Sequence, residues 1–312
     1  MAVLTKPPGR APTRAQKRTR AIRNTKAARR LVQLGVAGLI LTAAVRHQLE
    51  SGGNAASVDA LCPFGAVETL ITLFTTGSLI SKTHPSNLVL GLAVLVATVL
   101  VGNAFCGWIC PFGAVQDAIT WLRVKLGIKP LPVPPAVDRA LRYGRFVVLA
   151  VVLYFSVTTA RLWFADYDPY LQLFGLHWLF EWNDGLWVGL GILAAVLVGS
   201  VLVDRMWCRY LCPLGAVFAV VGRLSFLRIR RTESTCTDCT LCDRPCPVGI
   251  TVSKADPLVS ADCIGCMDCV ATCPVKGALN VSAPVFVGNL LGRSEAGRPS
   301  RPKAVTNEAV NR

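Results

Sequence analysis

Four uncharged, largely apolar stretches are separated by charged connections along the first two thirds of the chain. They cover residues 31–45, 87–105, 146–160 and 185–203. The two stretches of nineteen residues suit helices that cross a hydrocarbon core of about 30 Å at about 1.5 Å per residue. The two stretches of fifteen residues can cross only if the arginines that flank them extend to the membrane surface. The short–long order occurs twice, which predicts a mainly α fold with a four-helix transmembrane bundle built as two helix-pair repeats.

Composition and charge distribution fit a membrane protein better than a soluble enzyme. Hydrophobic residues make up 53% of the chain and charged residues 16%. The net charge of +15 is concentrated, since residues 1–30 hold ten Lys or Arg and no acid, and the connection 106–145 holds six against two Asp. The connections 46–86 and 161–184 have more acids than bases. The positive-inside rule then predicts a multi-pass protein of the bacterial inner membrane with both termini in the cytoplasm.

The basic N-terminal arm has two candidate partners. No groove-reading motif and no aromatic stacking platform accompanies it, so nucleic acid is not expected to bind. Anionic membrane lipid is the expected partner. We expect residues 1–30 to form a mobile cytoplasmic tail.

Two matching cysteine runs lie near the C-terminus. Each has the spacing Cys-x-x-Cys-x-x-Cys-x-x-x-Cys-Pro, over 236–247 and 263–274. This is the pattern of a bacterial-type ferredoxin with two [4Fe–4S] clusters, in which the last cysteine of each run ligates the other run's cluster. The expected ligands are Cys236, Cys239, Cys242 and Cys273 for one cluster, and Cys263, Cys266, Cys269 and Cys246 for the other.

Two other kinds of site also use closely spaced cysteines. Zinc knuckles favour two Cys-x-x-Cys pairs for each metal, and a disulfide scaffold suits a small secreted protein. Neither predicts two complete runs of this spacing. Reduced thiols and assembled clusters favour a cytosolic location, in agreement with the loop charges.

A second set of cysteines lies at the ends of the predicted membrane helices. The phrase Cys-Pro-(Phe/Leu)-Gly-Ala-Val begins at Cys62, Cys110 and Cys212, and the last two copies have another cysteine four residues earlier, Cys106 and Cys208. Proline suits the first turn of a helix, so each phrase predicts a helix with its cysteine at the N-terminus. If the two repeats pack face to face, Cys106, Cys110, Cys208 and Cys212 could converge and hold a further metal or cluster, or form two redox-active dithiols.

Simpler interpretations of these cysteines stay open. Free cysteines are often small buried residues, and these could be packing residues at crowded helix ends. Cys62 falls in a predicted outer loop with no partner cysteine there, so a structural role and a functional role are equally compatible with its position.

The predicted domains follow in chain order. A basic cytoplasmic tail covers 1–30, a four-span membrane domain with the Cys-x-x-x-Cys-Pro motifs covers 31–231, a 2[4Fe–4S] ferredoxin domain covers 232–280, and a polar tail covers 281–312.

These motifs together resemble those of the membrane-bound ferredoxin-type 4Fe-4S family of NapH, MauN and the C-terminal part of NosR. The resemblance covers roughly residues 30–280. It implies a quinol dehydrogenase-type subunit that relays electrons between the quinone pool, cytoplasmic clusters and a partner redox protein. We expect no flavin-binding region of the NosR type within the N-terminal part of this sequence.

Three functional hypotheses therefore stand. The first is an integral membrane iron–sulfur protein that takes electrons from a quinol and passes them on singly. The second is a maturation factor that reduces copper or a disulfide at the membrane cysteines. The third is a regulator whose clusters sense redox state.

Overall fold

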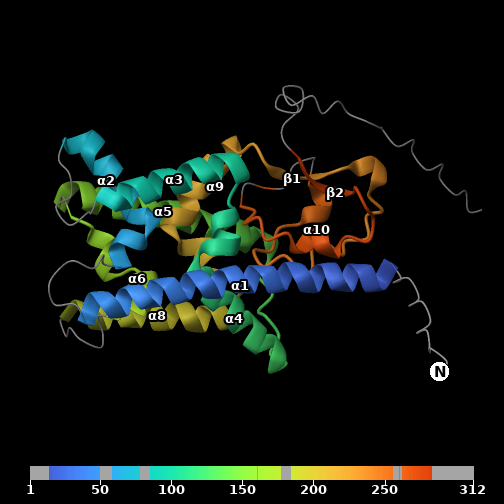
Figure 1. Ribbon diagram of the computed structural model, residues 1–312, viewed down its shortest axis with the longest axis horizontal. Helices are drawn as coiled ribbons and strands as arrows, with labels where there is room; N and C mark the ends of the chain where they lie inside the picture. The colour runs from blue at the N-terminus through green and yellow to red at the C-terminus, as the bar shows by residue number, and fades with distance from the viewer. Residues whose placement is uncertain are drawn as a thin grey trace, which may run out of the picture.

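The chain folds into a helical bundle with a small cysteine-rich unit at one end (Figure 1). The computed structural model describes residues 14–49, 58–77, 85–159, 161–176, 184–255, 260 and 262–282. Most of the described residues are helical, and the two short strands lie in the C-terminal unit.

Helix α1 (Arg14–Leu49) is 36 residues long and runs from the bundle to the C-terminal unit (Figure 1). The expectation of a mobile tail is wrong for residues 14–30, which are helical. The segment from Arg14 onward is rich in Ala, Arg, Lys and Gln, which are good helix formers, and it contains no proline. Residues 1–13 lie outside the described residues.

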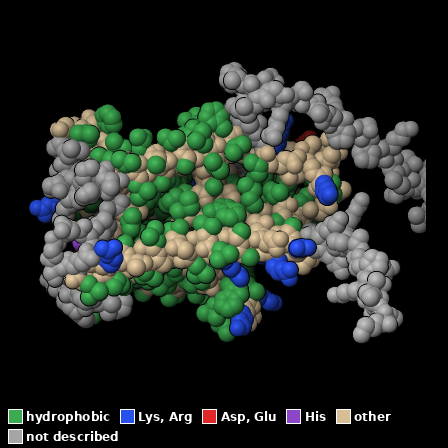
Figure 2. All heavy atoms as spheres, in the orientation of Figure 1, with side chains coloured by type: hydrophobic (Ala, Val, Ile, Leu, Met, Phe, Trp, Pro, Cys, Tyr) green, Lys and Arg blue, Asp and Glu red, His purple; other side chains and the backbone are tan. Residues whose placement is uncertain are grey.

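The other three apolar stretches also form helices, α3 (Pro85–Val101), α5 (Pro135–Thr159) and α8 (Asp184–Leu202). Among the described residues, two helical segments are long and apolar enough to cross a membrane, Thr19–Leu49 and Pro135–Thr159. The apolar parts of α3 and α8 are shorter, so the four-span bundle remains a prediction. Hydrophobic side chains cover much of the visible face of the bundle, and Lys and Arg lie toward its margins (Figure 2).

Each Cys-Pro phrase begins a helix, as predicted. Helices α2 (Pro63–Thr76), α4 (Pro111–Lys125) and α9 (Pro213–Val221) start at the proline, and the preceding cysteine is the N-cap residue. Proline fits this first position because its fixed φ suits a helix and its missing N–H would have no partner there. Single π-helical turns, η2 (Phe105–Ile109) and η4 (Trp207–Leu211), precede α4 and α9. Such turns occur often at functional sites.

The helices pack in a way that brings the two repeats together. Helix α2 packs on α3 and α5, α4 packs on α8 and α1, and η4 and α9 pack on α5. Glycine makes the α2–α3 approach close, because a Cβ on Gly91 would lie 2.2 Å from the Cβ of Ala66. Helix α6 (Pro169–Phe174), with the short turn η3 (Trp163–Asp166) before it, covers part of α8.

One flanking arginine does not behave as expected. Arg145 was expected to extend to the membrane surface, but it is buried and pairs with Asp262 of the C-terminal unit. A nearby carboxylate offers this guanidinium a partner that lipid headgroups would otherwise provide.

The C-terminal unit is closed by two antiparallel strands. Strand β1 (Arg228–Arg231) pairs with β2 (Leu279–Ser282), so that the strands bracket both cysteine runs. The short helix α10 (Asp268–Thr272) carries part of the second run. Ile229, Leu279 and Val252 form a small core with Cys269. The remaining short turns are η1 (Val58–Leu61), η5 (Gly222–Leu224), η6 (Glu233–Thr235) and η7 (Val252–Lys254). Residues 283–312, within the expected polar tail, lie outside the described part of the chain.

Candidate functional site

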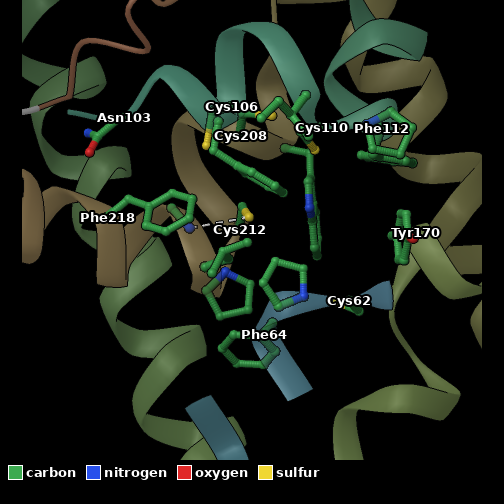
Figure 3. Close-up of a pocket in the computed structure, with 18 of the residues that line it drawn as sticks. Cys62, Phe64, Asn103, Cys106, Cys110, Phe112, Tyr170, Cys208, Cys212 and Phe218 are labelled. Carbon is green, nitrogen blue, oxygen red and sulfur yellow. Dashed lines mark hydrogen bonds between the residues drawn. The ribbon is translucent and has the colours of Figure 1, made fainter. Parts of the chain in front are cut away.

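The four cysteines of the Cys-x-x-x-Cys-Pro motifs converge inside the bundle (Figure 3). Cys106 and Cys208 lie on the π-helical turns η2 and η4, and Cys110 and Cys212 cap α4 and α9. The thiols lie close enough for Cys212 to interact electrostatically with the other three. The two repeats therefore form one site with four sulfur donors.

Hydrogen-bond donors point at two of these sulfurs. Gln116, which is fully buried, donates from Nε2 to Cys208 Sγ at 3.1 Å and accepts from Ser200 Oγ at 3.4 Å. The N–H of Gly215 donates to Cys212 Sγ at 3.4 Å. Hydrogen bonds to sulfur favour the thiolate, which is the form that binds metal.

The spacing of the sulfur donors bears on the kind of centre that they could hold. No three His, Cys, Asp or Glu side chains in the described part of the chain converge as ligands of one ion would. The ligands of an iron–sulfur cube are held farther apart, because the cube lies between them. An all-sulfur donor set also suits a cluster or another soft metal centre.

A cavity of about 310 Å³ extends from the four cysteines into the bundle (Figure 3). Cys62, the N-cap of α2, lines the same cavity and interacts electrostatically with Cys110. The prediction that Cys62 has no partner cysteine nearby is therefore wrong. The sequence places Cys62 and Cys110 on opposite sides of a predicted span, whereas α2 folds back between the helices.

Buried arginines connect this site to the C-terminal unit. Arg205 has no exposed surface; its Nε and Nη2 donate to Asp117 at 2.8 and 2.6 Å, and its Nη1 donates to the Cys106 carbonyl at 2.9 Å. Arg29 of α1 donates to Asp268 at 2.8 Å and lies 3.5 Å from Asp117. These four residues, whose side chains are at most 18% exposed, form a chain of alternating charges from η2 to α10.

A second group of ion pairs lies on the other side of the site. Arg142 and Arg145 of α5 both pair with Asp262, the residue before the first cysteine of the second run. Arg142 also donates to the Val248 carbonyl at 2.7 Å. Both arginines line the cavity, so positive charge lies between the four membrane cysteines and the second run.

The C-terminal cysteines form two groups that mix the two runs. Cys236, Cys239, Cys242 and Cys273 line one small cavity. Cys269 interacts electrostatically with Cys263, Cys266 and Cys246. The last cysteine of each run thus lies with the first three of the other run, which is the arrangement that the spacing predicts.

The group containing Cys266 faces the membrane site. Cys266 and Cys246 lie in an apolar cluster that Cys106 also contacts. Trp108 Nε1 donates to the Gly265 carbonyl at 3.0 Å, and a Cβ on Gly107 would lie 2.3 Å from the Ile264 carbonyl. Cys239 of the other group is exposed. We call the group of Cys246, Cys263, Cys266 and Cys269 the proximal site, and the group of Cys236, Cys239, Cys242 and Cys273 the distal site.

The thiols of the two sites differ in pKa because they differ in burial. Burial raises the pKa of Cys266 to about 12 and also raises that of Cys263, whereas the backbone N–H of Leu241 and the Thr237 side chain lower the pKa of exposed Cys239. Buried thiols hold their protons at neutral pH, so metal binding at the proximal site must release them.

Several of these residues were not singled out from the sequence. Gln116, Arg205, Asp117 and Asp262 had no signal beyond their nearness to cysteine motifs. Asp168, which lines the cavity, was counted only as a loop charge. Their partners lie far away in sequence, and single-sequence patterns do not report such pairings.

Comparisons with known proteins agree with this geometry. A 4Fe-4S binding domain model matches residues 83–129 and 186–232, which contain the four membrane cysteines. A 4Fe-4S dicluster domain model matches residues 228–274, which contain all eight C-terminal cysteines. No solved structure gives a significant match.

Similar curated proteins include three ferredoxin-type or electron-transport relatives. MauN, a methylamine utilization ferredoxin-type protein of Methylorubrum extorquens, is 33% identical over 278 residues, 85% of this chain and 89% of MauN. The ferredoxin-type protein NapH of Haemophilus influenzae is 32% identical over 216 residues, 65% of this chain and 72% of NapH. YccM of Escherichia coli is 31% identical over 227 residues, 72% of this chain and 63% of YccM, so this chain spans less than two thirds of YccM.

Proposed function

Because the chain belongs to the ferredoxin-type 4Fe-4S family of NapH, MauN and NosR, we propose that it is an integral membrane protein that relays electrons between the quinol pool and a partner redox protein. Iron–sulfur electron transfer is the activity that its relatives and its dicluster domain support. The finer claim is that it acts as a quinol dehydrogenase-type subunit. The observation that carries it is the packing of Cys106 against the apolar cluster that contains Cys266 of the proximal site.

The eight C-terminal cysteines are the proposed ligands of two [4Fe–4S] clusters. The distal site would hold one cluster and the proximal site the other, and the mixed grouping of the runs supports this assignment. When bound, such clusters supply one-electron transfer. The chain's own contribution is to fix the cysteines, to exclude water from the proximal site, and to surround that site with arginines.

The four membrane cysteines are the proposed ligands of a further cofactor. Their convergence, the Gln116 hydrogen bond and the buried guanidinium of Arg205 support this, because a thiolate-held centre is anionic and needs compensation when buried. Iron per chain in anaerobically purified protein tests the proposal. Eight irons fit two clusters alone, and a clear excess that disappears when all four membrane cysteines are replaced by serine supports a third centre.

The proposed location is the bacterial inner membrane, with both termini and the ferredoxin domain in the cytoplasm. Support comes from the basic connection 106–145, the basic segment before the first span and the use of eight cysteines in cluster motifs. A reporter active only in the periplasm, fused after residue 282, would stay inactive. Strong reporter activity contradicts this orientation.

The most direct test of the relay uses anaerobic membranes and electron paramagnetic resonance. A short-chain quinol should reduce the clusters and produce their signals, while the same quinol added to membranes without the protein should produce none. Clusters that stay oxidised with quinol but accept electrons from dithionite would contradict quinol oxidation while leaving the clusters intact.

A second candidate function is reduction of copper or a disulfide at the membrane cysteines during maturation of another protein. The convergence of four free thiols in one site favours it, because thiolates suit Cu(I). The variant with all four membrane cysteines replaced by serine discriminates. Loss of copper reduction with quinol oxidation retained would favour the maturation role.

A further inference from the structure

The cavity that the four cysteines line extends beyond them into the bundle, and aromatic rings form much of its wall. The rings of Phe164 and Trp207 are nearly parallel, at 4° and 6.4 Å between centroids. Phe64 meets Phe164 edge-on at 5.9 Å, and Phe112 meets Trp207 edge-on at 6.4 Å. A volume of about 310 Å³ lies within the range of small-molecule sites, and aromatic walls suit a planar ring.

The cavity reaches the apolar outer surface of the bundle. Leu39 of α1 and Ile109 of η2 both line it, and they are 66% and 42% exposed. In a membrane, side chains exposed on this face contact lipid. The exposed side chains of Leu39 and Ile109 therefore mark where the cavity opens toward the bilayer, which favours a lipid-soluble ligand.

Polar groups lie at both ends of this apolar space. Asp168, 6% exposed, lines one end, where its Oδ1 accepts the Tyr170 N–H at 3.0 Å. Arg142, Arg145 and Asn103 line the cavity near the four-cysteine site. Few polar groups in an apolar cavity fix the orientation of a ligand.

We propose that this cavity binds the ring of a lipid-soluble hydroquinone, with Asp168 as the acceptor for one ring hydroxyl. The inference rests on the proposed function, because it places the electron donor of that function beside the four membrane cysteines. Asp168 is a binding residue here.

The test measures binding without electron transfer. Full-length protein in nanodiscs is first reduced with dithionite, and binding of a radiolabelled short-chain naphthohydroquinone is then measured anaerobically against empty nanodiscs. Two variants probe the site. D168N keeps a good N-cap residue for α6 but removes the carboxylate, and L39W narrows the opening. The matched controls are D166N, at an exposed aspartate of η3, and L34W, at a 71% exposed position of α1 outside the cavity.

We expect Kd to rise at least tenfold in D168N, since a hydrogen bond to a charged group contributes about 1.5–3 kcal/mol. We expect a rise of the same size in L39W, because the larger indole obstructs the opening. The two controls should bind like the unmodified protein. Equal affinity in all four variants, or no binding above empty nanodiscs, would overturn the proposal. If the hydroquinone binds at this site but does not reduce oxidised clusters, the inference stands and the proposed function is contradicted. If quinol reduces the clusters but D168N and L39W bind it as tightly as the unmodified protein, the proposed function stands and the inference about this cavity fails.

Discussion

Gly107 is a point of close contact between the membrane domain and the ferredoxin unit. A Cβ at this position would lie 2.3 Å from the Ile264 carbonyl and 3.4 Å from the Cys266 nitrogen, both backbone atoms. The missing side chain therefore allows the proximal site to contact η2. The neighbouring Trp108–Gly265 hydrogen bond fixes the same contact.

We expect Gly107→Ala to weaken this contact by roughly 1–3 kcal/mol, the usual cost of overpacking a tight interior. Limited proteolysis should release a C-terminal fragment faster than from the unmodified protein. Gly191→Ala is the matched control, because a Cβ there meets nothing within 4 Å and alanine favours a helix. Equal rates of fragment release from the two variants would show that the contact at Gly107 does not hold the ferredoxin unit on the membrane domain.

At the scale of single residues, the sequence predicts which cysteines group together, but it does not predict which other residues contact them. Spacing alone predicts the mixed grouping of Cys246 and Cys273, because ligation of a cube demands it. Nothing in the sequence marks Gln116 as a donor to Cys208, or Arg145 as a partner of Asp262. Those contacts join residues 92 and 117 positions apart and depend on how the helices pack.

Helix α1 links the membrane domain to the ferredoxin unit. Its Arg29 bridges Asp117 of α4 and Asp268 of α10, and Gln33 donates to the Gly107 carbonyl at 3.2 Å. Asp268 lies between the proximal ligands Cys266 and Cys269 in sequence. The basic half of α1 therefore has a structural role at the interface in addition to its charge.

Replacing Arg29 by Gln should leave the buried carboxylate of Asp268 without its guanidinium, at a cost of about 3–5 kcal/mol. Arg30→Gln, at the adjacent exposed arginine, should change stability by less than about 1 kcal/mol. Hydrogen exchange over residues 14–30 checks both, with faster exchange expected only in R29Q. Similar exchange in R29Q and R30Q would contradict a bridging role.

The ion pairs of Asp117 in α4 predict a pH dependence. Burial opposes ionisation of Asp117, but Arg205, Arg29 and Gln33 outweigh it and hold its pKa below the ordinary value of about 3.9. A group with a depressed folded pKa contributes stability that is fully present above the unfolded pKa and is lost as pH falls through the folded pKa. Unfolding measured from pH 6 to pH 3 should show stability falling below about pH 4, and D117N should show a shallower fall. A D117N profile parallel to that of the unmodified protein would contradict this assignment.

Local sequence patterns predict most of the helices, with two exceptions. Charge boundaries place α3, α5 and α8, and proline after cysteine marks the starts of α2, α4 and α9. Residues 14–30 are helical although their high charge is typical of a solvated tail, because their helix-forming residues and α1 packing outweigh the charge. The return of α2 into the bundle, which brings Cys62 to the cavity, could not be predicted, because a fourteen-residue apolar helix has no pattern of its own to say where it packs.

At the scale of the whole molecule, three sulfur-rich sites follow one another in space. The membrane cysteines contact the proximal site through Cys106, and the distal site lies at the surface with Cys239 exposed. Topology from the sequence predicts a ferredoxin on the cytoplasmic side, but it cannot tell which cluster faces the membrane. That order depends on interface contacts such as the arginine pairs with Asp262.

A soluble paramagnetic dysprosium complex should therefore distinguish the two clusters. We expect it to speed spin relaxation of the distal cluster much more than that of the proximal cluster, because only the distal site has an exposed ligand. Variants Cys239→Ser and Cys266→Ser assign the two signals. Equal enhancement of both signals would contradict the proposed order.

The central claim is that electrons from quinol reach the ferredoxin clusters by way of the membrane cysteines. The measurement is cluster reduction, followed by electron paramagnetic resonance in anaerobic nanodiscs, in the unmodified protein and in the variant with Cys106, Cys110, Cys208 and Cys212 replaced by serine. We predict that dithionite reduces the clusters in both proteins and that quinol reduces them only in the unmodified protein. Reduction by quinol at the same rate in the serine variant would contradict the account.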